Sequence, residues 1–189
     1  MSPPRSKPAL FVSTSSGRRA PRNLLLPSMD AERRAQIGGF IQKFFIDGVP
    51  HNKAIGMRFL DIDRESVRFA LDYDPRFAGH PETGVMHGGV ITAFMDSCSG
   101  AAVMSKIRGK SRAATLDLRI DYMKPAPPGE TLICEARCYR TTRHIAFVRA
   151  ETFIGTKEQL IATSSATFAL MPFNASKMRE AFTPKKEGE

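Results

Sequence analysis

One apolar segment, from Gly88 to Ser105, limits the folds open to this chain more than any other feature. It reads GGVITAFMDSCSGAAVMS, and Asp96 is its only charged residue. A helix this apolar needs other elements to cover it, so the segment predicts a buried helix packed against a sheet. Its length would also fit a membrane span. Its many Gly, Ser and Thr residues, the central Asp96 and the strand-rich sequence that follows favour the buried helix.

The charge inside this segment is a first sign of function. Burying an unpaired carboxylate costs several kcal/mol, so we expect Asp96 to be hydrogen-bonded, ion-paired or used in chemistry. The pair Gly88-Gly89 leaves backbone N–H groups uncovered at the helix start, where they can stabilise a developing negative charge. Together these features suggest chemistry on a carbonyl group. The alternative is that Asp96 only ties down a loop or caps a strand.

Helical geometry separates the segment into two faces. The Asp96 face is lined by small residues and leaves room for a substrate or another subunit. Its other members are Gly89, Thr92, Ala93, Ser99, Gly100 and Val103. The opposite face suits packing on a sheet and contains Val90, Ile91, Phe94, Met95 and Cys98. His87 would lie across the helix from Asp96, so we predict that it orients the entry loop instead of forming an Asp–His pair.

The rest of the chain predicts one more helix and a sheet. A helix capped by Ser28 or Asp30 should run to about Asp47, because apolar residues recur at spacings of three and four, and Gly48 and Pro50 should end it. Alternation of apolar and polar residues then predicts strands. Their approximate ranges are 54–63, 65–73, 116–122, 130–141, 144–154 and 159–171. Consecutive hairpins imply an antiparallel sheet.

Composition divides the chain into three parts. Residues 1–28 are rich in Pro, Ser and Arg and predict a disordered basic extension. Residues 29–172 predict a single domain, and residues 173–189 a polar tail. The extension is also similar in composition to an organelle transit peptide, so an organellar location is the alternative to a cytoplasmic one.

Charge and cysteine content narrow the possible partners. The formal net charge is +9, but the N-terminal extension holds +5 and the tail +1 of it. The remaining charge of about +3 argues against a broad nucleic-acid surface and is compatible with a phosphorylated small ligand. Cys98, Cys134 and Cys138 are expected to be reduced core thiols. The histidines lack metal-ligand spacing, so neither a metal nor another cofactor is expected.

Two motifs carry a resemblance to a known family. GVMHGGV with Asp96 behind it (Gly84 to Asp96) and TLDLRIDYMKPA (Thr115 to Ala126) resemble the hot-dog-fold acyl-CoA thioesterases of the PaaI and 4-hydroxybenzoyl-CoA thioesterase type. The similarity covers roughly residues 50–171. It implies an α+β hot-dog fold, in which a long antiparallel sheet wraps a central apolar helix, here with an extra N-terminal helix. It also implies a homodimer or homotetramer with sites at the subunit interface.

The resemblance implies a role for each matching residue. Asp96 would be the general base or nucleophile of thioester hydrolysis. The N–H of Gly88 from the same chain as Asp96, with that of Gly89 as a second donor, would polarise the carbonyl. The hydroxyl of Thr115 would position water and come from the partner subunit. His80 stands where many relatives have Asn, which leaves open whether it takes over that role.

Binding residues for the substrate are expected around these groups. Thr92 lies on the Asp96 face and is a candidate contact. The phosphates of coenzyme A need cations, and the candidates near strand ends are Lys124, Arg140, Arg143 and His144. We expect hydrolysis of an acyl-CoA with a medium-sized or aromatic acyl group. The alternatives are a hot-dog hydratase or dehydratase and a non-catalytic acyl-CoA-binding protein.

Overall fold

The computed structural model describes residues 30–63, 66–108 and 111–172. The predicted extension (1–28) and tail (173–189) lie outside the described residues. The helices are α1 (Ala31–Ile41), the π-helical turn η1 (Gln42–Ile46), α2 (Pro50–Ala54), the 3-10 turn η2 (Pro75–Phe77) and α3 (Gly88–Ile107). The strands are β1 (Met57–Ile62), β2 (Ser66–Leu71), β3 (Ser111–Tyr122), β4 (Leu132–Thr141), β5 (Ile145–Ile154) and β6 (Thr156–Pro172).

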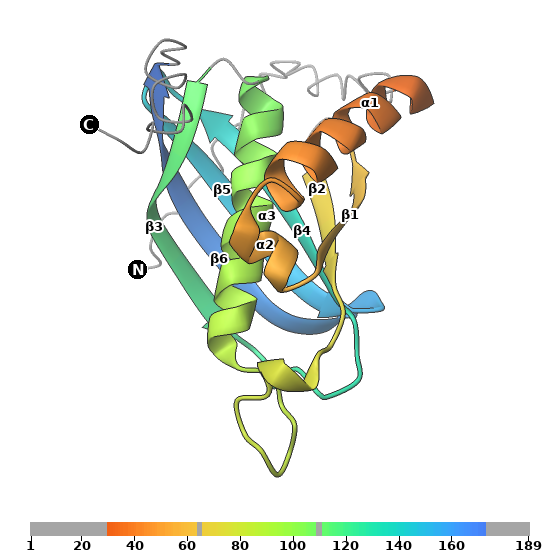
Figure 1. Cartoon of the computed structure of the whole chain (residues 1–189). Helices are drawn as coiled ribbons and strands as arrows, with labels where there is room; N and C mark the ends of the chain where they lie inside the picture. The colour runs from red at the N-terminus through yellow and green to blue at the C-terminus, as the bar shows by residue number, and fades with distance from the viewer. Residues whose placement is uncertain (1–29, 64–65, 109–110, 173–189) are drawn as a thin grey trace, which may run out of the picture.

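A single antiparallel sheet wraps around α3. Its strand order is β1-β2-β4-β5-β6-β3, so β1 and β3 form its two edges. Figure 1 shows α3 lying along the concave side of the sheet, with the α1–α2 segment in front of it. Ile91, Phe94, Met95 and Cys98 are buried, as expected for the face that packs on strands. The predicted α+β architecture is therefore confirmed.

The N-terminal helical region differs from the sequence prediction in its second half. Asp30 caps α1 as predicted, because its carboxylate accepts a hydrogen bond from the N–H of Arg33 at 2.7 Å. Pro50 was expected to end helical structure but instead begins α2. Proline is well suited to the first turn of a helix, because it lacks only an N–H that has no partner there. The first strand consequently begins at Met57, later than predicted.

A β-bulge in β3 changes which side chains face the helix. Thr115 pairs with Phe168 and Asp117 pairs with Thr167, so Leu116 has no partner of its own on β6. The extra residue reverses the alternation, as β-bulges do. Leu116 is 60% exposed instead of lying on the inner face with Leu118. Thr115 is turned toward α3 as a result.

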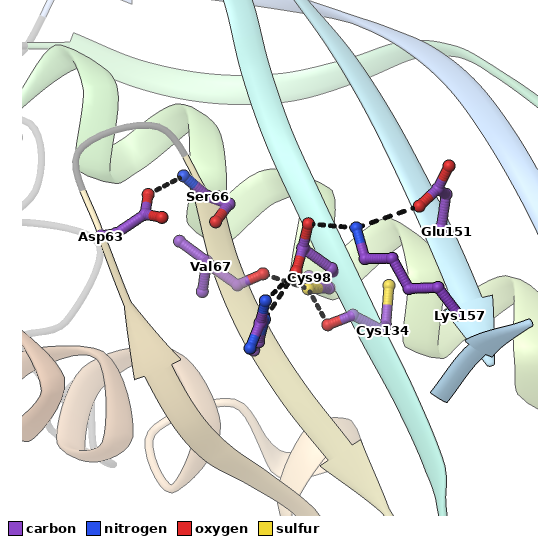
Figure 2. A network of polar contacts seen from close by, with 9 residues as sticks. Asp63, Ser66, Val67, Cys98, Cys134, Glu151 and Lys157 are labelled. Atoms are coloured by element: carbon purple, nitrogen blue, oxygen red, sulfur yellow. Dashed lines mark hydrogen bonds and ion pairs between the residues drawn. The ribbon is translucent and has the colours of Figure 1, made fainter. Parts of the chain in front are cut away.

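The core contains the three cysteines as free, buried thiols. Figure 2 shows Cys98 beside β2 and β4, where its thiol lies 3.5 Å from the carbonyl oxygen of Val67 and 3.4 Å from that of Cys134. Burial raises the pKa of the Cys98 thiol, so it stays protonated at neutral pH. The prediction of free core thiols is confirmed.

The polar face of the sheet carries an ion-pair network. Lys157 lies 2.6 Å from Glu135 and 3.2 Å from Glu151, and Arg68 also binds Glu135 at 2.6 Å. Burial alone would raise the pKa of Glu135, but the hydrogen bonds from Lys157 and Arg68 outweigh it, and the pKa lies below its usual value. This face of the sheet is charged and solvated. Because successive side chains of a strand point to opposite faces, the apolar side chains point to α3.

Candidate active site

Asp96 lies at a cleft of about 680 Å³ between α3, β3 and the η1–α2 segment. Its side chain is half-buried, and its Oδ1 accepts a hydrogen bond from the Thr115 hydroxyl at 2.8 Å. The sequence predicted that Asp96 would have a partner, and the structure confirms this. The expectation that Thr115 reaches Asp96 from a partner subunit is wrong, because the bulge in β3 brings Thr115 to Asp96 within one chain.

The cleft is mainly apolar, with a small polar group at one side. Its walls come from Phe45 and Val49, Ala93 and Met104 of α3, and Phe168 of β6. Such a site combines an apolar volume with a few convergent polar groups, as small-molecule sites usually do.

A buried amide holds the polar side of the cleft in place. Asn52 is only 4% exposed, and its side chain donates to the carbonyl of Phe45 at 2.9 Å and accepts from the hydroxyl of Ser97 at 3.0 Å. These bonds tie α2 to η1 and to α3. Asn52 was not among the residues predicted from the sequence. A lone Asn in a short polar stretch gives no signal of burial until the fold is known.

The N-terminus of α3 forms a second group of contacts. The carbonyl of Gly88 is 2.9 Å from the hydroxyl of Tyr122 and 3.1 Å from that of Thr92, and the two hydroxyls lie 2.9 Å apart. These contacts fix the orientation of the Gly88 peptide. Thr92 therefore binds the backbone of Gly88. Tyr122 binds the same carbonyl, a role that the alternation of residues along β3 did not predict.

The two N–H groups at this helix start are not equivalent. His87 is the N-cap of α3, and its Nδ1 accepts a hydrogen bond from the N–H of Gly89 at 2.9 Å. Among the described residues, none accepts a hydrogen bond from the N–H of Gly88. Gly88 is therefore the available donor. The predicted contribution of Gly89 is not supported, while the predicted role of His87 in orienting the loop agrees with its capping position.

We expect replacement of His87 by Ala to destabilise the protein by about 1 kcal/mol, because the cap of α3 is lost. Denaturant unfolding measures this difference. His87→Asn retains a side-chain acceptor for the N–H of Gly89 and should stay within a few tenths of a kcal/mol of the wild type. Equal destabilisation by both substitutions would show that the ring contributes through packing and not through the cap.

His80 is not brought to Asp96 in a single chain. It is exposed in the loop before α3, where its carbonyl accepts a hydrogen bond from the N–H of Gly84 at 2.9 Å. Figure 1 shows this loop projecting beyond the end of the sheet. His80 does not line the cleft at Asp96.

The predicted phosphate-binding cations lie at opposite ends of the sheet. Lys124 follows the end of β3 and lines a hollow of about 320 Å³ that also includes Gly88 and Tyr122. Arg140, Arg143 and His144 surround the β4–β5 turn, and the carbonyl of His144 accepts from the N–H of Leu170. Because residue 170 pairs with Ala113, the strand spacing puts this turn about 30 Å from Lys124. Within one chain, Lys124 is therefore too far from the other three side chains to bind the same coenzyme A phosphates with them.

Gly88 and Asp96 are also separated along α3. Eight residues of helix correspond to about 12 Å. A carbonyl bound to the N–H of Gly88 is therefore out of reach of Asp96 in the same chain. This separation argues against the expectation that Gly88 and Asp96 of one chain act together. If both groups act on one carbonyl, two chains must contribute to the site.

Comparison with known proteins identifies the family. Residues 83–161 match the thioesterase superfamily. A solved structure of a Pseudomonas aeruginosa protein is 32% identical, with a TM-score of 0.64, and the match covers 71% of this chain and 99% of that one. The chain belongs to the thioesterase superfamily.

Two further relatives agree with this assignment. The medium/long-chain acyl-CoA thioesterase YigI of Escherichia coli is 28% identical over 154 residues, covering 74% of this chain and 96% of YigI. The Escherichia coli PaaI protein is only 15% identical and shows the fold alone, with a TM-score of 0.63 over 72% of this chain and 94% of PaaI. The hot-dog fold and the class of enzyme, a thioester hydrolase, are those predicted from the sequence.

No helix in the described ranges has the length and apolar character needed to cross a membrane. The longest, α3, instead packs against the sheet.

Proposed function

We propose that this thioesterase-superfamily protein hydrolyses acyl-CoA thioesters in the cleft at Asp96. The observation that carries the proposal is the Asp96–Thr115 pair, a carboxylate with a fixed orientation at an apolar cleft. The name of the relative YigI, an acyl-CoA thioesterase, supports coenzyme A as the thiol part of the substrate.

In the proposed reaction Asp96 acts as general base. Thr115 donates to Oδ1, which leaves Oδ2 to accept a proton from a water molecule. The water oxygen attacks the thioester carbon, the C–S bond breaks, and the sulfur leaves as the thiol of coenzyme A after gaining a proton. Direct attack by Asp96, followed by hydrolysis of the mixed anhydride, gives the same products. Neither route requires a cofactor.

The carbonyl oxygen gains negative charge during attack, and we assign its stabilisation to the N–H of Gly88. A fixed hydrogen-bond donor to such an oxygen contributes about 3 kcal/mol in other hydrolases. Tyr122 and Thr92 hold the peptide through its carbonyl. The distance along α3 requires that this N–H come from a second chain.

A dimer through β3 supplies that second chain. β3 is an edge strand whose side chains are largely exposed, including Leu116 at 60% and Tyr122 at 50%. Long exposed edges pair readily with another strand. Two β3 strands related by a two-fold axis run antiparallel, so the Tyr122 end of one lies beside the Thr115 end of the other.

The same arrangement unites the predicted cations. Lys124 of one chain then approaches the β4–β5 turn of the other, which carries Arg140, Arg143 and His144. Cations from both chains can bind the phosphates of one coenzyme A. His80, in the loop at the Gly88 end, also moves toward the Asp96 cleft of the second chain.

Release of free coenzyme A from a panel of acyl-CoAs, followed with a thiol reagent, tests the proposal. We expect turnover of at least one linear acyl-CoA at rates far above the uncatalysed reaction. Hydration of an enoyl-CoA without thiol release would favour the hydratase alternative. Tight binding of acyl-CoA without either reaction would favour the non-catalytic one.

A further inference from the structure

The outer side of the α1–η1 segment exposes two phenylalanine rings. Phe40 is 56% exposed and Phe44 is 57% exposed, and their ring centres lie 4.8 Å apart. Both side chains also line a hollow of about 590 Å³ between this segment and the C-terminal half of α3. Single exposed apolar side chains are common on protein surfaces, whereas a continuous apolar patch is typical of an interaction surface.

Cations border this apolar patch. Arg33 and Arg108 line the same hollow, and the ammonium group of Lys43 lies 5.4 Å from the centre of the Phe44 ring. Of the described residues that line the hollow, none is acidic. By charge complementarity, the surface suits a partner that combines an apolar layer with negative charge.

Helical periodicity places these groups on one side of α1. Arg33, Gln36 and Phe40 follow one another at spacings of three and four residues. The ring of Phe44 contacts that of Phe40 and extends the row into η1. Glu32 points about 100° away from Arg33, because successive helical residues are rotated by that angle. Aromatic rings flanked by basic side chains are typical of helices that lie in the interface of a membrane.

The sequence that precedes α1 adds positive charge next to this side of the helix. Residues 1–29 contain five basic residues and no acidic one, and they join α1 at its N-cap, Asp30. Anionic lipids attract basic segments of this kind. Because the positive charge extends beyond the hollow, it favours an extended anionic surface over a single acidic peptide as the partner.

We propose that the face formed by Arg33, Phe40, Lys43, Phe44 and Arg108, the α1 face, binds the surface of an anionic lipid membrane. The two rings enter the boundary between head groups and acyl chains, while the cations contact the head groups. This inference goes beyond the proposed reaction and does not depend on it.

The dimer proposed above is compatible with such a surface. Two antiparallel β3 strands in one continuous sheet require a two-fold axis perpendicular to that sheet. Because α1 lies on the concave side, with α3 (Figure 1), both chains present the α1 face on the same side of the dimer. One bilayer then contacts both copies, which strengthens binding without any new contact within a chain.

Tryptophan fluorescence tests the proposal, because the chain contains no Trp. Phe44→Trp places a single indole in the α1 face, and Tyr139→Trp is the matched control at a position on β4 that is 51% exposed. The probes are vesicles of phosphatidylcholine, alone or mixed with an equal part of phosphatidylglycerol. We expect the mixed vesicles to shift the emission of Phe44→Trp to shorter wavelength, and brominated acyl chains to quench it. The emission of Tyr139→Trp should not change.

Co-sedimentation with the mixed vesicles measures the affinity. Phe40→Gln combined with Phe44→Gln should weaken binding by at least about tenfold, because both rings lose their burial in the bilayer. The control is Tyr139→Gln combined with Met171→Gln, which removes two exposed apolar side chains from strands and should leave binding unchanged.

The charge of the α1 face is tested in the same assay. Arg33→Gln and Lys43→Gln should each weaken binding about fivefold. Binding should also fall with added salt, which screens attraction between exposed charges.

Three outcomes overturn the proposal. The first is the absence of binding to the mixed vesicles. The second is undiminished binding after loss of Phe40 and Phe44, which would assign the attraction to residues 1–29 alone. The third is a Phe44→Trp emission that is already at short wavelength without vesicles and changes on dilution, which would make the α1 face a contact between copies of this chain. All three are read without hydrolysis of acyl-CoA, so they are independent of the proposed function.

Discussion

Replacing Asp96 with Asn is expected to lower kcat by about 10²–10⁴-fold, the contribution of a positioned general base. KM should change little, because Asn has nearly the same shape and fills the same space in the cleft. The side-chain oxygen of Asn can still accept the hydrogen bond from Thr115, so the cleft should keep its geometry. Steady-state kinetics with an acyl-CoA that the wild-type protein hydrolyses measures the effect.

The control is another carboxylate that is remote from the cleft. Glu151 lies on the solvated face of the sheet and pairs with Lys157. Glu151→Gln should retain wild-type kcat. Thermal unfolding of both variants should lie close to that of the wild type. An Asp96→Asn protein with undiminished kcat would falsify the assignment of Asp96 as base or nucleophile.

Replacing Gly88 with Pro is expected to lower kcat by about 10²–10³-fold, since proline removes the one N–H assigned to the carbonyl oxygen. The backbone suits proline here. Gly88 is the first residue of α3, and His87 has φ −65° and ψ 132°, an extended conformation that proline tolerates in the preceding residue. Kinetics at saturating acyl-CoA separates this loss from a change in binding.

Gly88→Ala provides the matched control. A Cβ at this position would lie 3.2 Å from the hydroxyl of Tyr122, so both substitutions cause the same close contact. Only Ala keeps the N–H, and we expect its kcat to remain near that of the wild type. If Ala and Pro reduce kcat equally, crowding against Tyr122 explains the loss and the N–H does not take part.

Mixing the two inactive variants extends this prediction to the subunit arrangement. When each site combines Asp96 of one chain with Gly88 of the other, a mixed dimer of Asp96→Asn and Gly88→Pro chains contains one intact site. Random assembly from equal amounts of both should restore about a quarter of the wild-type activity. Restoration does not occur if each site belongs to a single chain.

Periodicity in the sequence predicted most of the fold. The ranges predicted for β4, β5 and β6 agree with the structure to within a few residues, because alternation is regular where one face is buried. The apolar segment predicted α3 correctly, because a helix buried against a sheet has an almost uncharged sequence. Prediction was weaker at α2, where Pro50 can either end a helix or begin one, and the short stretch offers no periodicity that distinguishes the two.

The candidate site was predicted only in part. Asp96 was recognisable because a lone charge in an apolar helix needs a partner, and Gly88 because a glycine pair precedes that helix. The cleft around Asp96 depends on Asn52 and Phe45, which come from elements distant in sequence. No local pattern indicates that they approach α3.

The sequence alone determined the composition of the core and the positions of Asp96 and Gly88 on α3, since both follow from local periodicity. Tertiary structure alone decided which groups meet them. The bulge at Leu116 turned Thr115 toward Asp96, and the capping bond of His87 occupied the N–H of Gly89. Bulges and caps depend on how strands pair and how chain segments enter helices. Several local conformations have similar energies at these positions, and contacts with residues distant in sequence determine which one forms.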